Sequence, residues 1–249
     1  MSDFARYSNQ HRNISFERRD GILQIRLHTD GQSLKWGAVR GSIHDQLGEA
    51  FYQVGRDPLN EVVILTGTGD VFCTEFNMDE LPTDSTDHDA WYRIVREGKD
   101  LLMNLLDIDA PVIGAVNGPA HYHAELPALS DIVLAADHAT FADLAHYPSS
   151  TVPGDGAHVV WPMLLGPNRG RYFLMMGEQI PAAEAKALGI VGEVLPKDRL
   201  LPRAWEIAHM LKQKPLRVLR NTRIALTQRL KKNLLEELGF GLQLEGHGL

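Results

Sequence analysis

The amino-acid sequence predicts an α/β fold that becomes helical toward its C-terminus, and three observations lead to this prediction. Short apolar runs alternate with helix-period segments up to residue 155, which is the pattern of βα units around a buried sheet. Beyond that point, apolar residues recur almost only at helical spacing. The apolar fraction of 44% is sufficient for one large core.

The individual elements follow from the spacing of apolar residues. Residues 22–27 are expected to form a half-exposed strand, and three continuous apolar runs are expected to form buried strands: 62–66, 112–116 and 132–136. Helical spacing predicts helices over 37–54, 89–106, 157–165, 168–176, 182–188, 200–212 and 216–244. No Pro/Gly/Ser-rich linker or charge block divides the chain, so we expect one domain with a helical tail, divided as 1–200 and 201–249.

Net charge and cysteine content restrict the possible binding partners and the cellular compartment. The chain has 249 residues, and 32 acidic against 25 basic side chains give a net charge of −7, which repels polyanions and argues against a nucleic-acid partner. Cys73 is the single cysteine, so no internal disulfide is possible. The N-terminus lacks the apolar core of a secretory signal, and no apolar run approaches the roughly 20 residues of a membrane span. We therefore expect a cytoplasmic protein with no membrane partner.

One stretch, residues 216–232, concentrates basic side chains. They alternate with leucine and isoleucine at amphipathic helix spacing: Arg217, Arg220, Arg223, Arg229, Lys231 and Lys232. A solvated helix face explains this pattern, and a face that binds phosphate or nucleic acid is the alternative.

The order of several short motifs along the chain resembles that of the crotonase superfamily. The resemblance rests on Asn117-Gly118-Pro119-Ala120, Ser130-Asp131, Ala139-Thr140-Phe141, Val152-Pro153-Gly154, Leu165-Gly166 and Ala187-Leu188-Gly189-Ile190-Val191, with residues 63–69 and Phe72 upstream. It implies a core of ββα turns wound as a spiral, a C-terminal helical region that covers the active site and mediates trimerisation, and a homotrimer or a dimer of trimers, that is, a hexamer.

Departures from the crotonase pattern concern the catalytic turns. Typical members hold a thioester oxygen between backbone N–H groups of two glycine-containing turns, where this chain has residues 75–77 and 122–124. Side chains resist the backbone dihedrals that glycine allows, which puts the usual oxyanion hole and coenzyme A recognition in doubt. Glu125 occupies the place of one catalytic glutamate of the hydratases, but the second is replaced around Ala145-His146.

One subgroup, the bicyclic β-diketone hydrolases that include the enzyme opening 6-oxocamphor, is similar to this chain where it departs from the rest. The matching residues are Trp36, His44, His123, His146, the run 153–162, the run 170–174 and Glu245. The resemblance implies hydrolysis of a carbon–carbon bond in a small apolar diketone by a retro-Claisen reaction, with no cofactor and no metal.

That reaction needs an activated water, a stabilised oxyanion and an enolate leaving group. We assign water activation to His146 with Asp155, because a carboxylate on one imidazole nitrogen raises the basicity of the other. Glu245 is expected to position water or to act as a second base. His123 is expected to donate a hydrogen bond to the oxyanion or enolate in place of the lost backbone donors.

Substrate binding is assigned to residues with an apolar body. Trp36 suits the second carbonyl because its indole N–H is a donor only. His44 falls within a helical pattern and is expected to pack or to support the site, and Phe76 and Leu81 are expected to form an apolar wall.

Three rival interpretations remain. Alternate residues of a strand face one side, so His121, His123 and Glu125 together form a possible metal site, although nothing else in the sequence completes it. An acyl-CoA hydratase or isomerase would use Glu125 as its acid/base. A non-catalytic crotonase-like protein would bind RNA through the basic C-terminal helix.

Overall fold

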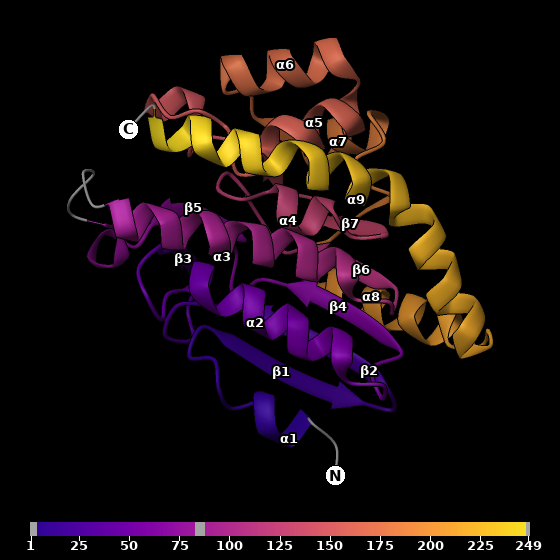
Figure 1. Ribbon diagram of the computed structural model, residues 1–249. Coiled ribbons are helices and arrows are strands. Elements are labelled where there is room, and N and C mark those ends of the chain that lie inside the picture. The colour runs from indigo at the N-terminus through magenta and orange to yellow at the C-terminus, as the bar shows by residue number, and fades with distance from the viewer. Residues whose placement is uncertain (1–3, 83–87, 248–249) are drawn as a thin grey trace.

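The fold alternates strands and helices and ends in one long helix that runs back across the molecule (Figure 1). The computed structural model describes residues 4–82 and 88–247. Its strands are β1 (Ile14–Arg19), β2 (Ile22–Leu27), β3 (Leu34–Trp36), β4 (Val62–Thr66), β5 (Cys73–Phe76), β6 (Val112–Val116), β7 (Ile132–Ala136), β8 (Thr140–Phe141), β9 (Ile180–Pro181) and β10 (Glu193–Leu195). Its helices are α1 (Phe4–Tyr7), α2 (Ile43–Arg56), η1 (Met78–Glu80), α3 (His88–Asp107), α4 (Glu125–Ala128), η2 (Tyr147–Ser149), α5 (Ala157–Leu165), α6 (Pro167–Met176), α7 (Ala182–Ala187), α8 (Lys197–Leu211) and α9 (Leu216–His247).

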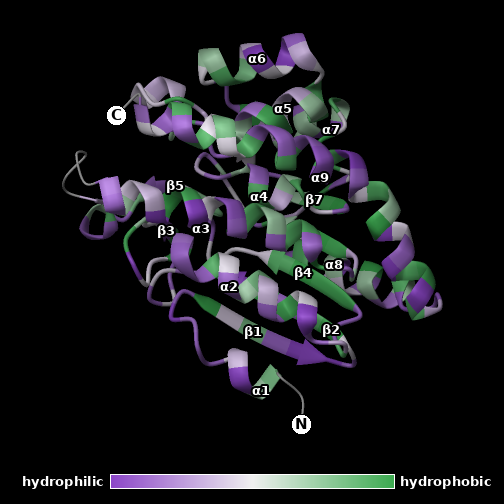
Figure 2. Cartoon of the chain, in the orientation of Figure 1, coloured by the Kyte–Doolittle hydropathy of each residue, from purple (hydrophilic) through white to green (hydrophobic). Residues whose placement is uncertain are grey.

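The larger sheet has, within the described residues, six strands in the order β1-β2-β4-β6-β7-β10. β1 is antiparallel to β2, and every other neighbouring pair is parallel. β4 and β6 are buried along their whole length, as expected for parallel strands that are covered on both faces. Figure 2 shows the central strands in green, whereas the helices around them carry purple outer faces.

A smaller sheet positions the candidate site. β3 pairs in parallel with β5, and β8 pairs antiparallel with β9. Parallel bridges from Ala120 to Cys73 in β5 and to Phe141 in β8 connect the two pairs. The carboxyl ends of β3, β5 and β8, and the segment that follows Ala120, therefore lie at one edge of this sheet, and the loops that leave this edge carry the candidate site.

Helices enclose the sheets. α8 packs on β4, β6 and β7, α2 packs along α3, and α9 crosses α3 and α5. A buried arginine anchors α9, because Arg223 Nε donates to the carbonyl of Ile108 and its guanidinium pairs with Asp131. Figure 1 shows α9 in yellow as it continues past α3 and α5 toward the C-terminus. Its last turns reach the candidate site.

The helix expected over 37–54 begins only at Ile43. Trp36 is paired with Phe76 in the smaller sheet, and the next residues form a turn in which the N–H groups of Ala38 and Val39 donate to the carbonyl of Glu80. These tertiary hydrogen bonds override the helical spacing of the segment. The remaining expected helices are present, with ends that differ by a few residues.

The expectation of a half-exposed strand over 22–27 is wrong, because β2 is buried except at Arg26. β1 and β4 flank it, and Trp205 of α8 donates its indole N–H to Gln24 at 3.0 Å. Sequence periodicity also does not identify β1 or the short strands β3, β5, β8, β9 and β10.

The division at residue 200 remains a prediction, and α8 (Lys197–Leu211) runs across it. Among the described helices, none combines the length and apolar character needed to cross a membrane.

Candidate active site

Residues from separate strand ends converge on one cavity. Trp36 ends β3 and Phe76 ends β5, and the two are register partners. His123 and His146 lie on the segments that leave the two bridges at Ala120. The smaller sheet therefore brings together side chains that are far apart in the sequence.

Two imidazole rings and three carboxylates form a buried chain. Asp143 Oδ1 lies 2.6 Å from His146 Nδ1, and His146 Nε2 lies 3.3 Å from Asp155 Oδ2. The same Asp155 oxygen lies 3.0 Å from His123 Nδ1, which also hydrogen-bonds Glu125 Oε1 at 3.0 Å. Each imidazole thus has an outer carboxylate of its own, and both share Asp155. Since Nδ1 of His123 is occupied, its Nε2 is the ring nitrogen left for a ligand.

The backbone and ring of His123 are both held in place. Its φ of 52° lies in the left-handed region that glycine usually occupies, and its ring stacks on Trp36 with centroids 3.6 Å apart and an interplanar angle of 26°. The expectation that a side chain resists this turn is thus wrong at His123. The turn keeps a glycine-like backbone and adds an imidazole.

Glu245 belongs to α9, which packs directly on the loop that carries Asp155. A Cβ at Gly154 would overlap the carbonyl oxygen of Gly241, and a Cβ at Gly241 would overlap the carbonyl oxygen of Gly154, so this approach requires glycine on both sides. Glu245 Oε2 is buried and has no hydrogen-bond partner among the described residues. It is therefore suited to hydrogen-bond a substrate oxygen or a water.

A cavity of about 400 Å³ opens onto these groups. Its polar end is formed by Trp36, His44, His123, His146, Asp155 and Glu245, and its apolar wall includes Phe76, Leu81, Trp91, Ile94 and Leu242. This volume and lining suit a small, mostly apolar organic molecule with a few oxygen atoms at one end.

His44 is buried beside Trp36, with ring centroids 5.9 Å apart. Its Nδ1 lies 3.1 Å from Glu97 Oε2, and Arg93 donates to both oxygens of Glu97 at 2.8 and 2.7 Å. Burial opposes ionisation of Glu97, but His44 and Arg93 outweigh it and hold the pKa of this carboxyl below its usual value. Because its Nδ1 is occupied, His44 has Nε2 left for the cavity.

The carboxylates of the chain stabilise protonated imidazole. Burial alone would lower the pKa of His123, but Glu125 and Asp155 outweigh burial and raise it to about 9. Burial likewise opposes protonation of His146, but Asp155 and Asp143 hold its pKa well above the ordinary value. Both rings therefore hold a proton more tightly than a histidine with an ordinary pKa does.

The pKa values of the acidic groups of the site shift in opposite directions. Burial disfavours the Asp155 carboxylate, but His146 and His123 outweigh it and hold the pKa of Asp155 well below its usual range. Burial and the negative charge of Asp155 raise the pKa of Glu245 to about 8, and the same two causes raise the pKa of Glu125. Such divergence between neighbouring groups is typical of acid–base sites.

The structure brings every expected site residue to the same cavity: His123, His146, Asp155, Glu245, Trp36, His44, Phe76 and Leu81. One assignment changes in detail. The hydrogen bond that orients His146, expected from Asp155, comes from Asp143, while Asp155 lies at ion-pair distance from Nε2.

Sequence reasoning missed Asp143 and Glu97, and it did not identify Glu125 as the partner of His123. The Asp-x-x-His spacing of Asp143 and His146 is a local signal that could have found the first. For Glu97 the signal is weaker, because Arg93 and Glu97 at i,i+4 are typical of any solvated helix.

The metal site considered in the sequence, His121 with His123 and Glu125, is not assembled. His121 Nε2 instead lies 2.7 Å from the hydroxyl of Thr140. Within residues 4–82 and 88–247, two other groups place suitable donor atoms within 4.8 Å of one another, namely His123, Glu125 and Asp155, and His146, Asp155 and Glu245. Both groups include Asp155, which is already an ion-pair partner of two imidazoles.

Several basic side chains of α9 already have acidic partners. Arg220 lies 3.4 Å from Asp109, Arg223 pairs with Asp131, and Lys231 pairs with Asp107. These ion pairs leave less positive charge for phosphate contacts and favour the interpretation as an ordinary helix face.

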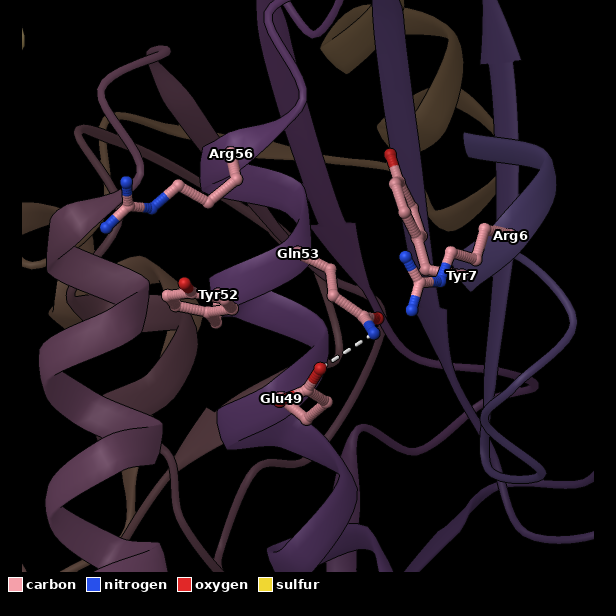
Figure 3. Close-up of a pocket in the computed structure, with 6 residues that line it drawn as sticks. All are labelled: Arg6, Tyr7, Glu49, Tyr52, Gln53 and Arg56. Carbon is pink, nitrogen blue, oxygen red and sulfur yellow. Dashed lines mark hydrogen bonds between the residues drawn. The ribbon is translucent and has the colours of Figure 1, made fainter. Parts of the chain in front are cut away.

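A second hollow, of about 270 Å³, lies between α1 and α2 (Figure 3). Figure 3 shows that the Arg56 guanidinium points away from Arg6, and that Gln53, which is hydrogen-bonded to Glu49, lies between the two arginines. The two guanidinium groups do not converge on one anion, so the hollow has no evident chemistry.

Comparisons with known proteins identify the family of this chain. The family model for enoyl-CoA hydratase/isomerase matches residues 17–247. A carnitinyl-CoA dehydratase from Citrobacter koseri is 32% identical over 199 residues, which cover 80% of this chain and 74% of that protein. A 4-chlorobenzoyl coenzyme A dehalogenase from Arthrobacter is 28% identical over 212 residues, covering 84% and 75% respectively.

Solved structures show the same fold. A β-diketone hydrolase from the cyanobacterium Anabaena, bound to (S)-3-oxocyclohexyl acetic acid, is 46% identical with a TM-score of 0.92, covering 96% of this chain and 95% of that one. An enoyl-CoA hydratase/isomerase from Mycobacterium paratuberculosis is 25% identical with a TM-score of 0.87, covering 95% and 93%. With the family model matched over residues 17–247, the chain belongs to the enoyl-CoA hydratase/isomerase family of the crotonase superfamily.

Proposed function

We propose that this chain is a hydrolase that cleaves a carbon–carbon bond of a cyclic or bicyclic β-diketone by a retro-Claisen reaction and yields a keto acid, without metal or organic cofactor. The observation that carries the proposal is the buried chain of two imidazoles and three carboxylates at the polar end of a small apolar cavity. The 46% identity to a β-diketone hydrolase over 96% of the chain supports it.

The first step is attack of water on one ketone carbon. In the active form His146 is neutral and takes a proton from water through Nε2, since Asp143 holds Nδ1. A carbon–oxygen bond forms, and the ketone oxygen becomes an oxyanion. Glu245, with its unpartnered Oε2, is placed to hydrogen-bond the water.

The second step breaks the bond between the attacked carbon and the carbon between the two carbonyls. The electron pair of this bond passes to the second carbonyl as an enolate, and the attacked carbon becomes a carboxylic acid. The proton taken from water returns to the enolate carbon, so substrate and water together account for all atoms of the product.

His123 is the proposed hydrogen-bond donor to the developing charge. Its Nδ1 is held by Glu125 and lies beside Asp155, so Nε2–H is the group available to the substrate oxygen. A donor aimed at charge that appears only in the transition state is worth about 3 kcal/mol of barrier. Trp36 and His44 are proposed to bind the second carbonyl, and Phe76 and Leu81 the hydrocarbon ring.

An acyl-CoA hydratase or isomerase is the second candidate, because the curated relatives act, by their names, on coenzyme A thioesters. That function would require Glu125 to reach the substrate. Its carboxylate lies behind His123, is 3% exposed, and is not among the residues that line the cavity. The geometry therefore favours the diketone.

We further propose that the protein is a cytoplasmic homotrimer or a dimer of trimers. Support comes from exposed apolar side chains on α6, namely Tyr172, Met175 and Met176, which a subunit contact would cover. Light scattering on the purified protein measures the subunit number. A monomer would remove this part of the proposal.

The function is tested by incubating the purified protein with a bicyclic 1,3-diketone and, separately, with a 2-enoyl-CoA thioester. We expect consumption of the diketone and formation of one keto acid, with no hydration of the thioester. Hydration of the thioester without diketone cleavage would support the second candidate. Retention of RNA that weakens steeply with salt, with neither activity, would support a non-catalytic role.

A further inference from the structure

His123 and His146 differ in the carboxylate that holds each ring, and this difference extends the proposed function. His146 Nδ1 lies 2.6 Å from Asp143 Oδ1, and both side chains are about 95% buried, at 5% and 4% exposure. On the other side of the ring, Asp155 is 3.3 Å from Nε2. The Asp143 contact is the shorter and meets the geometry of a hydrogen bond.

Backbone hydrogen bonds hold the segment that carries Asp143 and His146 in place. Ala142 N–H donates to the carbonyl of Ala120, and Leu144 N–H donates to the carbonyl of His121, so the segment with Asp143 is tied to the strand that leads to His123. The carbonyl of His146 accepts from Ser149 N–H at 2.7 Å and from Thr151 N–H at 3.0 Å. Both ends of the Asp143–His146 segment are therefore restrained independently of the side-chain contact.

The contact with Asp143 determines which tautomer of neutral His146 is favoured. A buried carboxylate beside Nδ1 stabilises a proton on that nitrogen, so that neutral His146 has its lone pair on Nε2, the nitrogen that faces Asp155. Without Asp143, Asp155 would attract the remaining proton to Nε2, and the lone pair would lie on the side away from the proposed water.

We propose that Asp143 is a positioning residue that fixes the tautomer of His146, and that Asp155 is a charge shared between the two imidazoles rather than the orienting partner of His146. This inference rests on the proposed function for its catalytic consequence, although the tautomer itself does not depend on any substrate. Asp143 acts only through His146.

The test compares Asp143→Asn with the unmodified full-length protein, both labelled with ¹⁵N in histidine. Nitrogen chemical shifts report which ring nitrogen of His146 carries the proton, and a pH titration reports the pKa of His146. We expect loss of the Nδ1–H tautomer and a lower pKa, because the charge that favours imidazolium is gone. An unchanged tautomer and an unchanged pKa would overturn the inference.

Kinetics give the second readout. Asp143→Asn should lower kcat by about 100-fold or more with a smaller change in KM, and the acid limb of the pH profile should move to lower pH. A matched control is Asp57→Asn, which removes an equally buried carboxylate paired with Arg18 far from the cavity and should retain kcat. Equal losses of kcat in the two variants would show that Asp143 is merely structural.

The two readouts separate the failure of this inference from the failure of the proposed function. If the unmodified protein does not cleave a diketone but His146 changes tautomer in the variant, the proposed function fails and the positioning role stands. If the diketone is cleaved at the same rate by the variant, the function stands and Asp143 has no positioning role.

Discussion

The ring of His123 lies flat on the indole of Trp36, with centroids 3.6 Å apart, while its Nδ1 faces two carboxylates. An aromatic face on one side and anions at the edge both favour the imidazolium form. The geometry of a single ring thus explains why the pKa of this largely buried histidine is raised rather than lowered. It also explains why His123 is a stronger hydrogen-bond donor than a neutral histidine would be.

Replacement of this donor should affect the transition state more than substrate binding. His123→Ala is expected to lower kcat by about 100-fold or more, with a smaller change in KM, and to reduce the stereoselectivity of the product. Steady-state kinetics and chiral analysis of the keto acid measure both effects. Because residue 123 has a φ of 52°, His123→Asn is the control: asparagine tolerates this backbone, so a loss in both variants excludes strain as the cause.

Removal of the shared charge should affect both rings. Asp155→Asn nearly preserves shape but removes the anion that lies 3.0 Å from His123 and 3.3 Å from His146, so turnover should fall by at least 100-fold. The Tm should also fall, because two buried imidazoles lose their shared partner, but the variant should stay folded at the assay temperature. Kinetics and thermal melting are compared on the same preparation. A normal rate, or a rate loss that unfolding accounts for, removes Asp155 from the catalytic set.

The pH profile should have its optimum on the alkaline side of neutrality. His146 must lose a proton to act as a base, and its pKa is raised, so kcat/KM should increase as pH rises above 7. His123 has a pKa of about 9, and its loss of a proton should make the rate decrease again. In His123→Asn the alkaline limb should be absent. An optimum below pH 6 would contradict these protonation states.

Stability should respond to pH with a defined sign. The folded-state pKa of His123 is about 9, above the ordinary value of 6.5, so its contribution is fully present below pH 6.5 and is lost as pH rises through 9. We therefore expect the Tm to decrease between these two pH values. Differential scanning calorimetry of the protein and of His123→Asn measures the difference, and the variant should show a smaller decrease.

The glycine contact of α9 makes a further prediction. Gly241→Ala would place a Cβ into the ring of His158 and the carbonyl of Gly154, and should shift Glu245 away from Asp155. Activity should fall at least tenfold. Gly239→Ala is the matched control two residues earlier on the same helix, because its Cβ would meet only the flexible end of Lys99. Equal activity in both variants would show that the contact does not position Glu245.

Part of this site is predictable from the sequence, and part depends on tertiary geometry. The run 153–162 and the separate positions Trp36, His123, His146 and Glu245 indicate the site because their residue types match a known subgroup. The sequence does not show that His123 and His146 share Asp155, because this arrangement depends on where β3, β5 and β8 end. These strands have two to four residues, too few for a period-two pattern to be recognised. The start of α2 is also not predictable from the sequence, because tertiary hydrogen bonds to the carbonyl of Glu80 determine it.

The most direct measurement is to follow a bicyclic 1,3-diketone in ¹⁸O-labelled water with the purified protein, a metal chelator and no coenzyme. The proposed reaction predicts one keto acid with a single ¹⁸O atom in its new carboxylate, formed at the same rate with and without the chelator. An intact diketone, or cleavage that chelation abolishes and zinc restores, would contradict the proposed reaction.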